Sequence, residues 1–457
     1  MEKPVNPYDY YTEINLNLWS YDTNFINLVE YIQEQFPKIG NPSIRKRHLT
    51  VVLANLYYTW IEDPDKFVGY DRMSNKYKAR SQYNILKIST LLIKIVDSLV
   101  DLNYIHNKKG HYELNNQSRI SKMKPESKLI KIFKEYKLKT MSVELHSSTP
   151  SIILKNIKNY VKEPVEYKIT KKLEDMRISL AAYNNLLRRS HIAIPNYPSD
   201  GIKKSNGKNI NYRENNKFVR RIFNNGSFTD GGRFYGGFWQ NLPKKWRLRI
   251  GINGSPVIEH DYSGLHIKLL YAQENINYDE DPYELQHPTY TNEELRPYLK
   301  KLLLIMLNSK SLNQLLKAIR WNSRSSLYSS YDHKEFVDIL INKHLPIKKY
   351  LYSGYGIKLQ RIDSTIAQHV IDTFTEKDIP VLCIHDSFIC ANVFEDELIK
   401  EMHIAYSSVS SSKKITLSHK SEDPYKYYQN IMTNNKDKNY VRALKNYQET
   451  AWKDHYK

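Results

Sequence analysis

The chain has 457 residues, and its 69 Lys and Arg residues outnumber its 49 Asp and Glu residues, which gives a formal net charge of +20. Because 40% of the residues are hydrophobic and 12% aromatic, a disordered chain is excluded, and two cysteines are too few for a disulfide framework. The longest apolar run, residues 302–307, is too short to cross a bilayer, and the first residues show no signal-peptide pattern. We therefore expect an intracellular, cytoplasmic protein of a reducing compartment without a membrane partner. The charge predicts a polyanionic partner, nucleic acid first.

The first 125 residues show two helical patterns followed by a basic hairpin. Residues 43–61 and 85–99 repeat apolar side chains at helical spacing, with Ser43 as a candidate N-cap. Residues 104–113 read as two short strands around Lys109-Gly110. This order is typical of a winged helix and predicts a mainly helical nucleic-acid-binding domain over residues 1–125. A small helical domain with a surface hairpin is an equally good interpretation.

The next part of the chain combines amphipathic stretches with a strongly basic segment. Residues 126–216 predict a helical connecting region, comparable in position to a thumb, that ends in a turn-rich stretch. Between Lys203 and Arg249 the basic residues crowd, and only Glu214 and Asp230 oppose them. The aromatic residues interleaved with this charge are Phe223, Phe228, Phe234, Tyr235, Phe238 and Trp239. Such a mixture predicts stacking faces for single-stranded or primer-template nucleic acid, and a solvated basic face is the alternative.

Two acidic residues are expected at strand ends. Residues 257–261 predict a strand that ends at Asp261, and a helical pattern begins at Leu265. Residues 380–390 predict an apolar hairpin interrupted by His385-Asp386, which would bring Asp386 beside Asp261 in one sheet. Carboxylates so placed suit a magnesium site. An N-cap is the structural alternative for Asp261.

Two further segments carry cations. Residues 229–233, Thr-Asp-Gly-Gly-Arg, combine a flexible Gly-Gly turn with the guanidinium of Arg233 and precede Gln240-Asn241-Leu242-Pro243. Arg296 and Lys300 lie four residues apart, on one face of a predicted helix. Two neighbouring cations repel each other and need an anion nearby, and a nucleoside triphosphate supplies one. A basic surface near the helix start, which the helix dipole disfavours, is the structural alternative.

Taken together, these segments resemble the palm and fingers of single-subunit polymerases, namely the family A DNA polymerases and the phage-type RNA polymerases. The matching segments are Thr229-x-x-Gly232-Arg233 (TxxGR), 240–243 (QNIP), Asp261-Tyr262-Ser263 (motif A), Arg296-x-x-x-Lys300 (motif B), 359–370 (the helix before motif C) and His385-Asp386-Ser387-Phe388 (motif C). The resemblance covers residues 218–405. It implies an α+β fold with an antiparallel palm sheet and helical fingers over residues 217–430, followed by a helical tail over 431–457.

The resemblance also implies a function, a template-directed nucleotidyltransferase that extends a primer 3′-hydroxyl with dNTPs on DNA or RNA, without proofreading. Asp261 and Asp386 would be catalytic and hold two Mg²⁺ ions, which Mn²⁺ could replace. The nucleotide-binding residues would be Arg296, Lys300, His266, Asn308 and Tyr262. The residues that contact nucleic acid would be Arg233, Thr229, Gln240, Asn241, Gln360, His369 and His385.

The chain departs from the family pattern at four positions. Asn308-Ser309 replaces the Tyr-Gly of motif B, and Ser387 replaces an auxiliary carboxylate. His266 replaces a glutamate that excludes the 2′-hydroxyl, and its bulk favours deoxynucleotides. A primase or RNA polymerase that uses NTPs, and a palm that binds nucleic acid without catalysis, remain alternatives. The abundance of Lys, Asn, Tyr and Ile indicates an AT-rich genome, such as that of a virus or mobile element.

Overall fold

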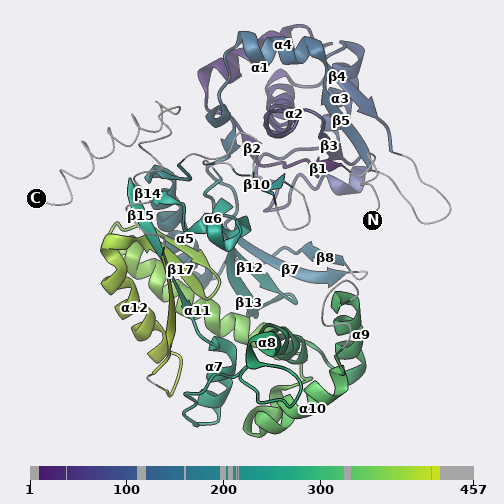
Figure 1. Ribbon diagram of the computed structural model, residues 1–457. Coiled ribbons are helices and arrows are strands. Elements are labelled where there is room, and N and C mark those ends of the chain that lie inside the picture. The colour runs from purple at the N-terminus through teal and green to yellow at the C-terminus, as the bar shows by residue number, and fades with distance from the viewer. Residues whose placement is uncertain are drawn as a thin grey trace, which may run out of the picture. The chain divides into compact units, whose positions relative to one another are not determined.

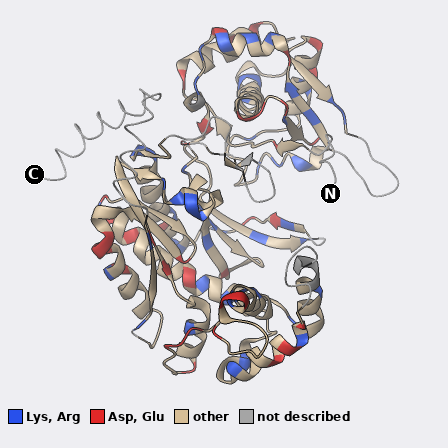
Figure 2. Cartoon of the chain, viewed as in Figure 1, with Lys and Arg blue, Asp and Glu red and all other residues tan. Residues whose placement is uncertain are grey.

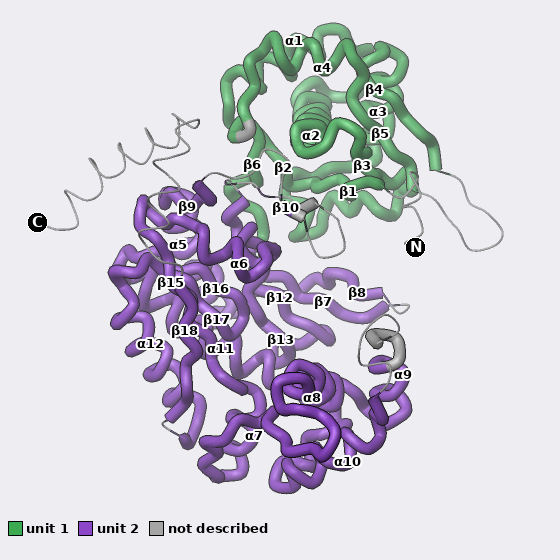
Figure 3. Tube along the Cα trace, in the orientation of Figure 1, with its two compact units in different colours: residues 1–150 green, residues 151–457 purple. Residues whose placement is uncertain are grey.

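The computed structural model divides the chain into two compact units, Met1–Pro150 and Ser151–Lys457 (Figures 1 and 3). It describes residues 10–37, 39–110, 120–158, 161–195, 202–203, 209–210, 212, 214, 216–323, 331–412 and 414–421. Each unit has its own hydrophobic core and combines helices with sheets in which most neighbouring strands are antiparallel, so the α+β class is confirmed. No helix among these residues is both long and apolar enough to cross a membrane. The single division at Pro150 differs from the boundaries expected at residues 125 and 216.

Unit 1 is organised around one long buried helix. Its helices are α1 (Thr23–Glu34), α2 (Pro42–Glu62), α3 (Leu91–Asp101) and α4 (Ser127–Glu135). Residues 48–57 of α2 are all buried. The apolar side chains of this stretch form the centre of the unit 1 core. The N-cap of α2 is Asn41 rather than Ser43. The Asn41 side chain accepts hydrogen bonds from the backbone N–H groups of Ser43 and Ile44, and Pro42 fits the first helical turn because it needs no partner for an N–H.

The sheet of unit 1 has the order β1 (Tyr11–Glu13), β3 (Phe67–Tyr70), β5 (Ser121–Pro125), β4 (Ile105–Lys108). A short pair, β2 (Leu18–Trp19) with β6 (Glu144–Leu145), lies apart from it. The sheet makes unit 1 less helical than expected. β4 coincides with the first strand of the hairpin expected at residues 104–113. Its antiparallel partner, however, is β5, which lies further along the chain than the expected second strand. The second expected strand, at residues 111–113, lies outside the described residues.

Helix α3 starts six residues later than the apolar spacing predicts. The Asn84 side chain accepts a hydrogen bond from the Ile88 N–H at 2.9 Å and donates one to the Ile88 carbonyl at 2.8 Å. Lys87 adopts a positive φ of 50°, which no α-helix tolerates. These local bonds make a turn of residues 84–88, so their apolar side chains join the core without forming a helix.

Unit 2 contains a first sheet that includes strands from the segment expected to be helical. Its order is β13 (Ser227–Tyr235), β12 (Arg220–Asn224), β7 (Ile152–Lys158), β8 (Val161–Pro164). In β7 the buried residues Ile152 and Leu154 alternate with more exposed ones, which is the period of a strand and not of a helix. The helical connecting region predicted over residues 126–216 therefore contains strands as well as helices. The long helix of this region is α5 (Lys171–Arg189). Further along the chain, β10 (Ile202–Lys203) pairs with β11 (Asn209–Ile210).

The second sheet of unit 2 carries the acidic motifs. Its order is β16 (Val381–Ile384), β17 (Ser387–Ala391), β15 (Ser255–Tyr262), β14 (Gly251–Ile252), β9 (Ile192–Ala193), and β18 (Leu417–Ser421) also pairs with β15. Helices α11 (Gly356–Glu376) and α12 (Glu395–Ser407) contribute Val370, Ile371 and Met402 to the core that these strands share (Figure 1). The expected strand at 257–261 and the expected hairpin at 380–390 are confirmed.

A group of helices follows β15 in the chain and lies in the lower part of unit 2 in the view of Figure 1. They are α7 (Leu265–Gln273), α8 (Asn292–Asn308), α9 (Leu312–Ser323) and α10 (His333–Lys343), and the short helix α6 (Lys244–Arg247) precedes β14. Thr291 and Glu294 cap α8 reciprocally through side chain and backbone. Arg296 and Lys300 therefore lie in the second and third turns of α8. The expected C-terminal helix at 431–457 lies outside the described residues.

Candidate active site

Asp261 and Asp386 lie at the same end of two adjacent strands. β15 and β17 are antiparallel, and their register pairs Asp261 with Ser387. Asp386 occupies the turn between β16 and β17, directly before Ser387, and its backbone carbonyl accepts a hydrogen bond from the Tyr262 N–H at 3.3 Å. The hairpin thus brings together two carboxylates that are 125 positions apart in the sequence.

The two carboxylates interact electrostatically. Burial, together with the negative charge of Asp386, raises the pKa of Asp261 to about 6, although Lys420 and Lys300 act in the opposite direction. The Asp261 side chain is still 27% exposed, so a ligand can reach it. A divalent cation bound between the carboxylates would relieve their repulsion, and carboxylate oxygens are the donors that Mg²⁺ prefers. The residues of the site therefore fit a magnesium ion.

A cavity of about 240 Å³ opens at these carboxylates. Its polar lining comes from five different segments of the chain: Arg233 of β13, Asp261 of β15, His266 of α7, Lys300 of α8 and Asp386 of the β16–β17 turn. The other lining residues are Tyr262, Gly264, Leu265, Ile267, Tyr283, Leu303, Leu304 and Leu307. The cavity therefore combines acidic groups, cations and an apolar wall, which is the mixture that a nucleotide requires.

Arg296 and Lys300 are placed differently with respect to the cavity. Both cations lie over the ring of Tyr283, with 5.5 Å from the Arg296 guanidinium carbon and 5.9 Å from Lys300 Nζ to the ring centroid. Arg296 Nε donates a hydrogen bond to Asp281 Oδ2 at 2.7 Å, and the Arg296 side chain is 46% exposed. Lys300 lines the cavity, and Arg296 does not. Lys300 is therefore the cation of this pair that faces the carboxylates.

Arg233 and His266 share a buried partner that the sequence analysis did not single out. Arg233 Nε donates to both carboxylate oxygens of Asp363, at 2.9 and 3.1 Å, and its Nη2 also binds this carboxylate. His266 Nε2 lies 2.8 Å from Asp363 Oδ2. The Asp363 side chain is fully buried. The sequence did contain a signal for this partner, because Asp363 lies on the apolar face of α11 with Leu359. A carboxylate on such a face needs a buried partner.

Glu259 and Lys420 extend the acidic site along the same face of β15. Glu259 accepts hydrogen bonds from Arg247 at 2.7 and 2.9 Å and from the Ser387 hydroxyl at 2.9 Å. Lys420 of β18 lies 3.2 Å from Glu259 and 3.4 Å from Asp261. The sequence could have predicted that Glu259 shares a face with Asp261, because residues two apart in a strand point to the same side. No local sequence signal could have identified Lys420, because its position depends on the pairing of β18.

Two residues expected to touch nucleic acid have other partners. The Gln240 amide donates to the carbonyls of Phe234 and Cys383, at 3.0 and 2.9 Å, and its oxygen accepts from the Gly236 N–H. Gln240 therefore joins β13 to β16. The Thr229 hydroxyl is hydrogen-bonded to that of Ser227 at the exposed start of β13, and Thr229 does not line the cavity.

Most of the remaining expected residues also lie outside the cavity lining. His369 Nε2 lies 3.3 Å from Glu401 of α12, and the exposed Asn308 donates to the Leu304 carbonyl. His385 lies in the turn next to Asp386, with its ring 5.2 Å from that of Tyr235. Gln360 and Asn241 do not line the cavity either. Tyr262 does line it, but its hydroxyl donates to a backbone carbonyl of α12 at 2.5 Å.

Most of the aromatic residues expected to stack on nucleic acid belong to the core. Phe223 and Trp239 are fully buried, and Phe234 and Phe238 are each 1% exposed. Arg221 is buried as well and binds Gln368 and backbone carbonyls. The prediction of stacking faces at these positions was therefore wrong, because these rings pack into the core. Phe223 and Phe234 do so from β12 and β13, and Phe238 and Trp239 from the short helix that follows. Basic side chains that remain at the surface include Lys244 and Lys245 of α6, coloured blue in Figure 2.

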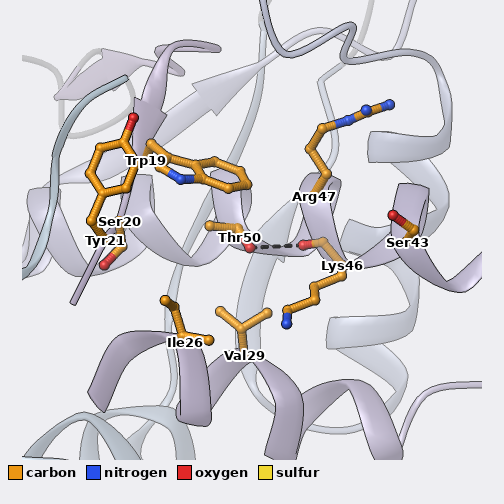
Figure 4. Close-up of a pocket in the computed structure, with 9 residues that line it drawn as sticks. All are labelled: Trp19, Ser20, Tyr21, Ile26, Val29, Ser43, Lys46, Arg47 and Thr50. Atoms are coloured by element: carbon orange, nitrogen blue, oxygen red, sulfur yellow. Dashed lines mark hydrogen bonds between the residues drawn. The ribbon is translucent and has the colours of Figure 1, made fainter. Parts of the chain in front are cut away.

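A second cavity, of about 330 Å³, lies within unit 1 (Figure 4). Trp19 and Tyr21 contribute aromatic rings to its lining, and Lys46 and Arg47 of α2 contribute cations. The described residues that line it include no carboxylate. This cavity can hold an apolar or anionic group, but it lacks the acidic pair of the first one.

Comparisons with known proteins give little guidance. No family model and no curated protein matches the sequence. Among solved structures, the chain is similar to the POL domain of Pol1 from M. smegmatis in complex with DNA primer-template and dNTP, at 10% sequence identity and a TM-score of 0.31. The match covers 86% of this chain and 65% of that one, so the chain spans less than two thirds of that domain. A TM-score of this size does not establish a common fold.

Proposed function

We propose that the chain is a template-directed nucleotidyltransferase that extends a primer 3′-hydroxyl with dNTPs. The observation that carries this proposal is the pair Asp261 and Asp386, which lies at adjoining strand ends and faces Lys300 across one cavity. In this interpretation the sheet of β15 to β18 is the palm, and helices α7 to α10 are the fingers. The sequence resemblance to single-subunit polymerases supports the same assignment.

The side chains of the cavity have separate roles in this reaction. Asp261 and Asp386 would hold the divalent cations, and Mg²⁺ bound there would supply the positive charge that lowers the pKa of the 3′-hydroxyl and stabilises the pyrophosphate leaving group. Lys300 neutralises the triphosphate from the opposite wall. Arg296, one helical turn before Lys300 on α8, exchanges its bond with Asp281 for a phosphate oxygen when the nucleotide arrives. Mn²⁺ binds the same oxygen donors and can replace Mg²⁺.

His266 supports the choice of dNTPs over NTPs. Its Nε2 is held 2.8 Å from the buried carboxylate of Asp363, so the ring is a fixed part of the cavity wall. A fixed ring next to the nucleotide sugar leaves less room for a 2′-hydroxyl than a small side chain does. A primase or RNA polymerase with the same site would instead use NTPs as substrates.

Unit 1 is the part of the chain that we propose binds duplex nucleic acid. Its β4–β5 hairpin follows helix α3, which is the arrangement of a winged helix. The hairpin carries Lys108 and Lys124, whose ammonium groups both lie 5.2 Å from the ring centroid of Phe67. Lysines on a hairpin can contact phosphates without reading base sequence.

Primer extension tests the proposal. The full-length protein is incubated with primed or unprimed single-stranded template, Mg²⁺, and either dNTPs or NTPs. We expect extension of the primer by dNTPs, and a loss of at least about 100-fold in Asp386→Asn or Asp261→Asn, since each removes a metal-binding charge. Lys300→Ala should raise the KM for dNTP more than Arg296→Ala does.

Asp338→Asn is the matched control, because it removes an exposed carboxylate of α10 that does not line the cavity. Product made from NTPs without a primer would favour the primase or RNA polymerase. Absence of any product, or equal product from Asp386→Asn, would exclude the catalytic proposal and leave a palm that only binds nucleic acid.

A further inference from the structure

A group of metal-ligating side chains lies on the face of β15 opposite Asp261. His260 of β15, Glu395 of α12 and His419 of β18 place their ligand atoms within 4.8 Å of one another. Side chains alternate between the two faces of a strand, so His260 points away from the face that carries Glu259 and Asp261. This group is therefore separate from the acidic pair of the candidate active site.

The three side chains converge on one point. The β15–β18 register pairs His260 directly with His419, and their rings stack with centroids 5.0 Å apart and planes 16° apart. One oxygen of Glu395 lies 2.8 Å from His260 Nε2 and 3.3 Å from His419 Nε2. Bonds of about 2.0–2.1 Å to a tetrahedral metal hold neighbouring donor atoms about 3.3 Å apart. The contact of His260 with Glu395 would have to open by a few tenths of an ångström. The two histidine nitrogens, which lie within 4.8 Å of each other, would have to adopt the same donor separation.

The donor set identifies the kind of metal. Two imidazole nitrogens and one carboxylate oxygen suit Zn²⁺ and its transition-metal neighbours, whereas Mg²⁺ prefers oxygen donors alone. The His260 side chain is 4% exposed, and that of His419 is 49% exposed, so the group is open on one side. We propose that His260, Glu395 and His419 bind one zinc ion, with the fourth position open to water.

Such an ion would fix the position of strand β18. It would link β18 to β15 and to the start of α12 (Figure 3). Lys420 follows His419 and points to the opposite face, where it lies beside Glu259 and Asp261. The zinc site would thus hold in place the strand that delivers an ammonium group to the candidate active site. This proposal does not depend on nucleotidyl transfer.

Metal titration of the full-length protein tests it. The protein is stripped with a chelator and titrated with Co²⁺ in excess Mg²⁺ while visible absorption is recorded, and bound Co²⁺ is then displaced with Zn²⁺. We expect one equivalent of a Co²⁺ site that depends on His419. His419→Ala and Glu395→Gln should lose the absorption band and weaken Zn²⁺ binding at least about tenfold. His419→Cys should retain the site and add a thiolate-to-Co²⁺ charge-transfer band.

Two variants serve as controls. His403→Ala removes a histidine of the same helix, α12, that is not part of the group, and Asp386→Asn removes a carboxylate of the candidate active site. Both should bind Co²⁺ and Zn²⁺ as the wild type does. The proposal is overturned if the wild type binds no Zn²⁺ in excess Mg²⁺. It is also overturned if His419→Ala and Glu395→Gln bind Zn²⁺ as tightly as the wild type, or if His419→Cys adds no thiolate band.

Discussion

Lys420 Nζ lies 3.4 Å from Asp261 Oδ2, so an ammonium group of the last described strand stands beside the carboxylate that we propose binds a metal ion. The same ammonium lies 3.2 Å from Glu259, its direct cross-strand partner. Lys420 therefore neutralises the acidic face of β15 when no divalent cation is bound. A cation that approaches Asp261 has to overcome the repulsion of Lys420.

Lys420→Met should consequently bind divalent cations more tightly. The substitution removes one positive charge at about 3–4 Å from the proposed ligand, and a charge at this distance changes binding by roughly a kcal/mol or more. We expect the dissociation constant for Mn²⁺, measured by electron paramagnetic resonance of free Mn²⁺, to fall at least threefold by this estimate. Lys420→Arg should differ little from the wild type.

Lys244→Met is the control for this prediction, since it removes the same charge from an exposed position on α6. An equal gain in Mn²⁺ affinity in both variants would show an effect of net charge alone. If Lys420→Met does not bind Mn²⁺ more tightly than the wild type, Lys420 does not compete with the divalent cation.

Arg233 and Asp363 should depend on each other for stability. The Asp363 side chain is fully buried and that of Arg233 is 15% exposed. Removing one partner of a buried ion pair leaves the other uncompensated and costs about 3–5 kcal/mol. We expect this loss, measured by urea unfolding, in Asp363→Leu and in Arg233→Met alone. The double variant Arg233→Met/Asp363→Leu should recover most of it, and strictly additive losses would disprove the coupling.

His266→Ala should change sugar selection if the chain polymerises nucleotides. Loss of the ring opens the cavity wall where the proposal places the nucleotide sugar. We expect the ratio of kcat/KM for dNTP to that for NTP to fall at least about tenfold, a change of roughly 1.4 kcal/mol in discrimination. His403→Ala should leave this ratio unchanged. An unchanged ratio in His266→Ala would show that His266 does not contribute to the selection of the sugar.

His344 should make unit 2 sensitive to mild acid. Burial lowers the pKa of His344 to about 4, although its hydrogen bond to the Pro282 carbonyl acts in the opposite direction. Because this pKa lies below the usual value of about 6.5, the contribution to stability is complete above pH ~6.5 and is lost as the pH falls towards 4. The loss amounts to at most about 3 kcal/mol.

His344→Gln provides the measurement for this prediction. The free energy of unfolding is compared between the wild type and the variant at several pH values from 7.5 to 4, where contributions of the other histidines cancel. The difference between the two proteins should shrink as the pH falls. A difference that stays constant over this range would refute the assignment.

The boundary at Pro150 sets the design of a truncation. A cut after residue 125 would separate α4 and β6 from the core of unit 1, to which Phe133 and Val143 belong. A chain that begins at Ser151 should remain folded, because its core uses residues of unit 2 alone. We expect it to bind duplex DNA more weakly, with a smaller dependence on salt. Unchanged binding and salt dependence, measured by fluorescence anisotropy, would exclude unit 1 as the duplex-binding part.

The sequence by itself determined the local elements around the site. The strand that ends at Asp261, the hairpin interrupted at Asp386 and the shared face of Arg296 and Lys300 follow from periodicity within about ten residues. The same local information misjudged residues 85–90, where the side chain of Asn84 replaces the hydrogen bonds of a helix. It also misjudged Phe223 and Trp239, because an aromatic residue looks the same in sequence whether it lies in the core or at the surface.

Only the tertiary structure decided which charges meet. Arg233 and Asp363 are 130 positions apart, and Asp261 and Lys420 are 159 apart. Their contacts depend on how α11 packs and on the register of β18 against β15, and a shift of one residue would turn Lys420 to the other face. Register and packing are set by the burial of the whole core. The sequence therefore specified the reactive groups, and the folded sheet and its helices specified their partners.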